Sequence, residues 1–118
     1  MGQGLDEQIR TSFQQLADAP EFAGERLWLT LYLCGEPTGL RRLAEALSAL
    51  GWQNVDGSEG AFIYPKREVA KTSDAILEAA KAAQALCGRH RVEMLNIDAD
   101  TSLDVRQSRF MTLYRSAG

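Results

Sequence analysis

Several residue types are scarce in this chain of 118 residues, and each scarcity excludes a class of protein. Two cysteines and one histidine provide neither a disulfide framework nor the ligand set of a zinc site. The longest nearly apolar run, residues 27–34, is far too short to cross a bilayer. The N-terminus lacks a basic segment followed by an apolar run, so we expect no secretory signal. We therefore expect a cytoplasmic protein with reduced thiols and no membrane partner.

Positive charge is not in excess. The chain has 13 Lys and Arg against 16 Asp and Glu, a formal net charge of −3. Because a protein that grips nucleic acid mainly by charge needs a basic surface, this balance disfavours that mode of binding. The hydrophobic fraction of 45% is ordinary for a globular protein, and the length fits a single domain over residues 1–118.

Hydrophobic periodicity predicts an N-terminal helix followed by a strand. Within residues 1–20, apolar side chains recur at helical spacing and form one stripe: Leu5, Ile9, Phe13 and Leu16. Residues 26–34 alternate instead, with leucines at every odd position and Trp28, Thr30 and Tyr32 among the even ones. Because both sides carry apolar bulk, this pattern is typical of a central strand that is covered on both faces.

The rest of the chain predicts two more helices and further strands. One helix ends at Gly51, with a buried stripe at Leu40, Leu43, Leu47 and Leu50. Strands at 52–55 and 61–64 form a hairpin that Pro65 stops. Residues 66–71 are a charged connection, a helix then runs to Gly88, and residues 91–97 form another strand. Residues 110–114 fit either a helix or a strand.

This order of elements predicts an α+β fold. Residues 26–98 form a ferredoxin-like βαββαβ sandwich, in which both helices lie on one face of a four-stranded antiparallel sheet. Residues 1–20 add an N-terminal helix, and residues 99–118 add a C-terminal extension that contains a strand or a helix.

An aromatic surface is expected on the sheet face away from the helices. If the leucines of the first strand face the helices, Trp28 and Tyr32 point the other way. The adjacent third strand then places its own aromatic side chains on the same face, and two basic residues that follow it form a basic rim. The predicted partner-binding residues are Trp28, Tyr32, Phe62, Tyr64, Lys66 and Arg67.

Three explanations of this surface stay open. The N-terminal helix or the C-terminal segment covers it, it binds a protein or a second copy of the chain, or it stacks the bases of single-stranded RNA. Leu31-Tyr32-Leu33 and Gly60-Ala61-Phe62-Ile63-Tyr64 resemble the two short motifs of RNA-recognition-motif domains. However, Glu59 stands where the second motif begins with a basic residue, so RNA ranks below a protein partner.

No pattern of catalytic residues withstands scrutiny. Asp98-Ala99-Asp100-Thr101 resembles the D-x-D-x-T form of phosphotransferring aspartate enzymes, with its threonine one position earlier, but those enzymes need a large α/β domain after the motif. We therefore expect a strand that ends in a polar loop here. His90 has no nucleophile or metal partner near it in the sequence. We expect no enzyme, no catalytic residue, no cofactor and no metal.

The segment Ala46-Leu47-Ser48-Ala49-Leu50-Gly51-Trp52 and the order of elements resemble the ribonuclease E inhibitor family, also described as regulator of ribonuclease E activity B. Members of that bacterial family carry an N-terminal helix and a short Asp- and Pro-containing break before a βαββαβ domain. The resemblance implies non-catalytic inhibition of a ribonuclease by binding to it. We therefore expect a protein-binding regulator or inhibitor whose partner is a ribonuclease or a toxin. The alternatives are single-stranded RNA binding and a ligand-binding regulatory dimer.

Overall fold

The computed structural model describes residues 4–53, 61–103 and 108–116. Its helices are α1 (Leu5–Asp18), η1 (Pro20–Phe22, a short 3-10 helix), α2 (Pro37–Ala49) and α3 (Ser73–Arg89). Its strands are β1 (Arg26–Cys34), β2 (Phe62–Ile63), β3 (Lys66–Ala70), β4 (Glu93–Asp100) and β5 (Phe110–Arg115). The predicted α+β class is confirmed. The predicted loop at 56–60 and residues 54 and 55 of the predicted strand at 52–55 lie outside the described residues.

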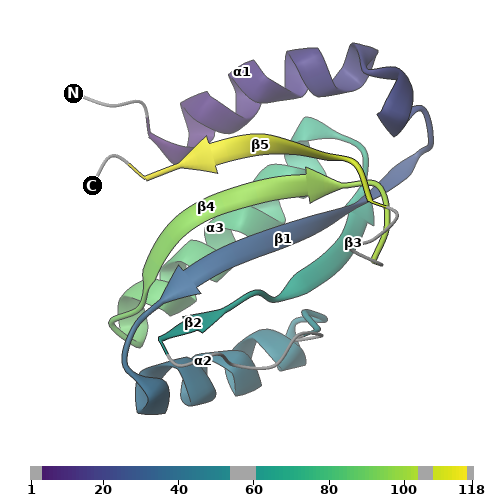
Figure 1. The fold of residues 1–118 in the computed structure, drawn as a ribbon. Coiled ribbons are helices and arrows are strands. Elements are labelled where there is room, and N and C mark those ends of the chain that lie inside the picture. The colour runs from purple at the N-terminus through teal and green to yellow at the C-terminus, as the bar shows by residue number, and fades with distance from the viewer. Residues whose placement is uncertain (1–3, 54–60, 104–107, 117–118) are drawn as a thin grey trace.

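The strands form one antiparallel sheet of five strands with β1 at its centre (Figure 1). Both β2 and β3 pair with one side of β1, and β4 pairs with its other side. Outside β4 lies β5, which resolves the ambiguous segment 110–114 as a strand. In Figure 1, α3 lies behind the sheet, α2 lies below it, and α1 runs along β5.

The two faces of β1 are chemically different, as its alternating sequence predicts. Its leucines are buried on the side of the sheet that packs against the helices, which we call the helix face: Leu27, Leu29, Leu31 and Leu33. They belong to one apolar cluster with the buried stripes of α1, α2 and α3. The other side of the sheet, toward the viewer in Figure 1, is called the open face.

The helix ends follow local chemistry. Thr72 accepts a hydrogen bond from the Ala75 backbone N–H and so caps α3. At the end of α2, Gly51 has a φ of +94°, which a residue without Cβ adopts at little cost. Leu50, expected in the buried stripe of α2, is 42% exposed. The helix ends at Ala49, so the Leu50 side chain leaves the stripe, and Trp52 is the next buried residue.

Residues 66–71 are mostly a strand, and the predicted charged connection is wrong. Pro65 interrupts the ladder because it has no N–H to donate. Its carbonyl nevertheless accepts a hydrogen bond from Leu31 N at 2.9 Å, so the chain stays beside β1 and continues as β3. Lys66 and Val69 are buried within it. The proline therefore divides one long segment into β2 and β3 instead of ending it.

The last predicted strand is also longer than expected, because Asp98 to Asp100 belong to β4 and are not a polar loop. Beyond β4, α1 lies along the free edge of β5. The Gln8 side chain donates to the Arg115 carbonyl at 3.0 Å and accepts from its N–H at 3.1 Å, while Ser12 donates to the Leu113 carbonyl. The helix thus satisfies backbone groups that an edge strand leaves open.

None of the helices in the described part of the chain is both long enough and apolar enough to span a membrane.

Candidate functional site: the open face of the sheet

Three of the four predicted aromatic side chains gather at one end of the open face. Tyr32 and Tyr64 meet edge to face, with ring centroids 5.4 Å apart and ring planes at 72°. Phe62 lies opposite Cys34 on the neighbouring strand and is 39% exposed. Trp28 lies on the same face but further along β1, opposite Glu68. We call Trp28, Tyr32, Phe62 and Tyr64 the aromatic group.

The described parts of the N- and C-terminal segments do not lie over this group. Instead, α1 packs against α3 and along β5, and β5 itself extends the sheet (Figure 1). Trp28, Tyr32 and Tyr64 keep an intermediate exposure. The aromatic group is therefore partly accessible, which is the condition that a binding surface requires.

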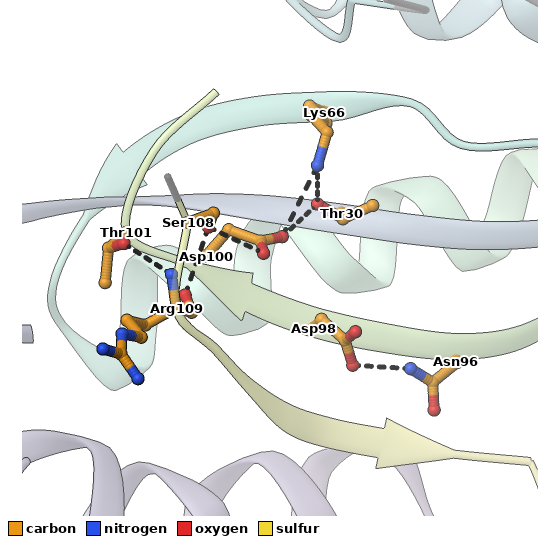
Figure 2. Close-up of polar contacts among 8 residues, drawn as sticks. All are labelled: Thr30, Lys66, Asn96, Asp98, Asp100, Thr101, Ser108 and Arg109. Atoms are coloured by element: carbon orange, nitrogen blue, oxygen red, sulfur yellow. Dashed lines mark hydrogen bonds and ion pairs between the residues drawn. The ribbon is translucent and has the colours of Figure 1, made fainter. Parts of the chain in front are cut away.

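A cluster of buried polar side chains surrounds Thr30, which lies between Trp28 and Tyr32 on the open face of β1 (Figure 2). Lys66 is 3% exposed and Asp100 is 6% exposed. The Lys66 ammonium donates to Thr30 Oγ1 at 2.7 Å and lies 3.6 Å from Asp100 Oδ2. Thr30 in turn donates to Asp100 Oδ2, and Ser108 donates to Asp100 Oδ1 at 3.1 Å. These bonds compensate the burial of one charge pair.

Asp98 is the second buried carboxylate on this face, with an exposure of 4%. Asn96 Nδ2 donates to its Oδ1 at 2.6 Å (Figure 2), and the Tyr32 phenol also hydrogen bonds to it. Burial, followed by the charge of Asp98 and this hydrogen bond, raises the pKa of Tyr32 well above its ordinary range. Tyr32 therefore links the aromatic group to the polar cluster.

The sheet register explains why these groups meet. Thr30 of β1 lies directly opposite Lys66 on one side and Asp98 on the other, and residues paired across strands share a face. Ser108 joins them from the connection between β4 and β5, where Thr101 N donates to the Arg109 carbonyl and Arg109 N donates to Thr101 Oγ1. We define the polar cluster as Thr30, Lys66, Asn96, Asp98, Asp100 and Ser108.

The two predicted basic residues do not form a rim around the aromatic group. Lys66 is on the open face, but its charge is buried beneath the surface and paired with Asp100. Arg67 lies opposite Leu29 and therefore belongs to the helix face, where it lines a hollow together with Leu50 and Ala79. The two positive charges expected beside the rings therefore lie elsewhere, one in the buried ion pair and one on the helix face.

The sequence analysis does not predict the polar cluster, because it ends the strands before Lys66 and before Asp98. A strand that ends at residue 97 leaves Asp98 and Asp100 in a loop. A connection at residues 66–71 likewise leaves Lys66 outside any strand. The available signal was alternation: Asn96, Asp98 and Asp100 alternate with Ile97 and Ala99, which is the period of a strand with one polar face.

Chemically, the open face combines aromatic rings with an uncompensated negative charge. The polar cluster holds two carboxylates and one ammonium, and no ion pair among the described residues involves Asp98. Within residues 4–53, 61–103 and 108–116, His, Cys, Asp and Glu side chains do not gather in a group of three that could hold a metal. The arrangement is suited to binding a complementary surface.

Comparisons with models of protein families, with curated proteins and with solved structures find no match to this chain. A functional interpretation therefore depends on the geometry of the open face. Two features of that face carry the interpretation: the partly exposed rings of the aromatic group and the negative charge of Asp98 beside Tyr32.

Proposed function

We propose that this protein is a non-catalytic regulator or inhibitor that binds another protein through the open face of its sheet. The observation that carries the proposal is the aromatic group, which remains partly exposed while α1 lies on β5 and α3. Large aromatic side chains are enriched at the centres of protein interfaces and provide much of the binding energy there. A sheet face that exposes such rings gains from a partner that removes them from water.

The fold that we propose is the ferredoxin-like sandwich expected from the sequence, extended by α1 and β5. Supporting it, Gln53 and Lys66 exchange two backbone hydrogen bonds of 2.7 Å each, so the chain after α2 meets β3 as the second strand of such a sandwich meets the third. The resemblance to the ribonuclease E inhibitor family depends on the same arrangement.

Charge favours a protein partner over RNA. Phosphates need cations beside the bases, yet Lys66 is buried in an ion pair and Arg67 lies on the helix face. A ribonuclease or a nucleic-acid-directed toxin has the opposite property, because an enzyme that binds a polyanion presents basic side chains to it. A regulator with a negative open face is complementary to such a surface, and this makes a ribonuclease or toxin the partner class that we propose.

The test begins with capture from a bacterial lysate on the immobilised protein, followed by titration of each purified candidate partner by calorimetry. The variant Tyr32→Leu with Tyr64→Leu removes two rings from the open face, and Leu50→Ser removes an exposed apolar side chain from the helix layer. We expect the tyrosine variant to weaken binding at least tenfold and Leu50→Ser to leave it within twofold.

Folding of each variant is checked by thermal unfolding. If the tyrosine variant does not fold, Phe62→Ser carries the test, because the Phe62 ring is already 39% exposed and its loss leaves the core intact. Equal affinity of wild type and open-face variants for every captured protein, or the absence of a stoichiometric partner, would overturn the proposal.

A further inference from the structure

The carboxylate of Asp98 on β4 lies beside Tyr32, one of the two tyrosines of the aromatic group. Asp98 is 4% exposed, and its carboxylate accepts hydrogen bonds from Tyr32 and Asn96. Lys66, the one ammonium of the polar cluster, is bound to Thr30 and Asp100. Arg109, the other basic residue drawn in Figure 2, points its side chain away from Asp98 and Asp100. Arg115 lies opposite Asn96 on β5, but no ion pair among the described residues involves Asp98.

A buried charge acts over a longer distance than an exposed one, because the protein around it screens less than water does. Tyr32 extends this effect to the surface, since its hydroxyl is bonded to Asp98 and its ring contacts Tyr64. Burial is the main cause of the raised pKa of Tyr32, and the charges of Asp98 and Asp100 add to it. The faces of tyrosine rings are themselves negative and attract cations.

We infer that the open face recognises a cationic side chain of its protein partner, arginine in particular, which lies on the Tyr32–Tyr64 rings beside Asp98. This inference rests on the proposed function and names the chemistry of the partner. A guanidinium group is planar, stacks on aromatic rings and loses its hydration more easily than an ammonium group. An arginine-bearing segment therefore satisfies the rings and the buried charge together.

Charge complementarity separates this occupant from two others. A second copy of the chain would bring its own Asp98 toward the first, and like charges facing each other across an interface oppose association. A phosphate of RNA would meet the same negative potential without a basic rim to offset it. The negative charge that opposes a second copy of the chain and an RNA phosphate attracts an arginine side chain.

The inference is tested with short peptides added to the full chain at low salt, followed by NMR. The probes are hexa-arginine, hexalysine and hexaglutamate, with hexauridylate as an RNA probe. We expect hexa-arginine to shift the signals of Tyr32, Tyr64 and their neighbours, hexalysine to bind about threefold more weakly, and the two anionic probes to leave these signals unchanged. Tighter binding of hexauridylate than of hexa-arginine would overturn the inference.

Matched variants separate the site from general attraction to an acidic protein. Asp98→Asn removes the buried charge and keeps an acceptor for Tyr32, whereas Glu45→Gln makes the same charge change at an exposed position on α2. We expect Asp98→Asn to weaken hexa-arginine binding about fivefold, because the guanidinium loses the attraction of the buried charge, and Glu45→Gln to change it by less than twofold. Equal effects of both variants would overturn the inference.

Should Asp98→Asn fail to fold, Tyr64→Leu replaces it, since this variant removes a ring and no charge. It is expected to cause a comparable loss, and unchanged binding of hexa-arginine would contradict the inference. Light scattering completes the test, because a dimer that Tyr64→Leu dissociates would assign the face to a second copy. If a purified partner loses affinity with the tyrosine variants and keeps it with Asp98→Asn, the arginine inference fails while the proposed function stands.

Discussion

At the centre of β1 the two faces are almost equally buried, and they reach that state by opposite means. On the helix face, Leu29 and Leu31 are completely buried among other apolar side chains. Between them on the open face, Thr30 is 3% exposed and is surrounded by charged side chains that hydrogen bond to it. Low exposure alone therefore does not identify a hydrophobic core, and the chemistry of the neighbours decides what a buried position is for.

The difference has a functional meaning. Replacing a buried ion pair by apolar residues of similar size is often neutral or stabilising, so stability does not explain why Lys66 and Asp100 occupy the open face. The apolar alternation on the helix face is sufficient to specify the strand and its register. The polar cluster instead gives the open face a charge that an apolar sheet surface would lack, which agrees with its proposed role in recognition.

The largest effect is expected from Lys66→Met. This change leaves the Asp100 carboxylate buried beside Thr30 without its cation, and breaking a buried pair in this way costs about 3–5 kcal/mol. Urea unfolding at pH 7 measures the loss.

A second substitution provides the control for that experiment. Adding Asp100→Asn to Lys66→Met removes the charge that the single change leaves behind, while Asn still accepts from Thr30 and Ser108. The double variant should recover part of the lost stability. Strict additivity of the two single changes would show that the pair is not coupled and would contradict the description of the open face as an electrostatic cluster.

On the helix face, Leu31→Ala should lower the free energy of unfolding by about 2–5 kcal/mol. The Leu31 side chain is fully buried, so the change removes apolar contacts and leaves a cavity. In contrast to Lys66→Met, this change leaves no buried charge without a partner. Urea titrations of the two variants at pH 7 compare the faces directly, and a loss of less than about 1 kcal/mol for Leu31→Ala would contradict the description of the helix face as a packed core.

Alkaline pH should destabilise the protein through one group on each side of the sheet. Burial raises the pKa of the free Cys87 thiol to about 12, whereas the unfolded thiol titrates near 8.5. From about pH 9 the native state therefore holds a proton that the unfolded state has released, and stability falls by up to about 1.4 kcal/mol per pH unit. Tyr32, whose pKa is also raised, adds to this slope above about pH 10.

Two single substitutions separate these contributions. Cys87→Ala should remove the part of the slope that begins near pH 9, and Tyr32→Phe should remove the part that begins near pH 10. Urea midpoints measured from pH 7 to pH 11 give both slopes. A profile for Tyr32→Phe that parallels wild type above pH 10 would show that the phenol is not held protonated by the open face.

The leucine side of the fold could be predicted from the sequence because apolar periodicity reports it directly. The bounds of β1 agree with the structure, as does the position of Gly51 at the end of α2. The open face could be predicted only in part. The alternation in β1 placed Trp28 and Tyr32 on it, and the predicted pairing of β1 with the third strand brought Tyr64 to Tyr32.

The polar cluster could not be predicted because it depends on pairing between distant residues. Lys66 and Asp100 look like solvated loop charges in the sequence, and only the registers Thr30–Lys66 and Trp28–Asp100 bring them together. Pro65 also resembles a strand end in the sequence, although its carbonyl accepts a hydrogen bond from Leu31 and so holds the chain beside β1. Local patterns report burial along one strand, whereas the partner of a buried charge is set by tertiary contacts.

The smallest effect on stability is expected from Phe62→Ser on the open face, and it sharpens the comparison with Leu31→Ala. The Phe62 ring is 39% exposed, so its removal leaves little cavity and should cost about 1 kcal/mol or less. Its effect on partner binding should exceed that of Leu31→Ala, because the exposed ring is available to a partner. Calorimetric titration with the purified partner should show a loss of at least fivefold for Phe62→Ser and less than twofold for Leu31→Ala at a temperature where both are folded. A variant series in which affinity simply follows stability would mean that the two faces do not divide folding from recognition.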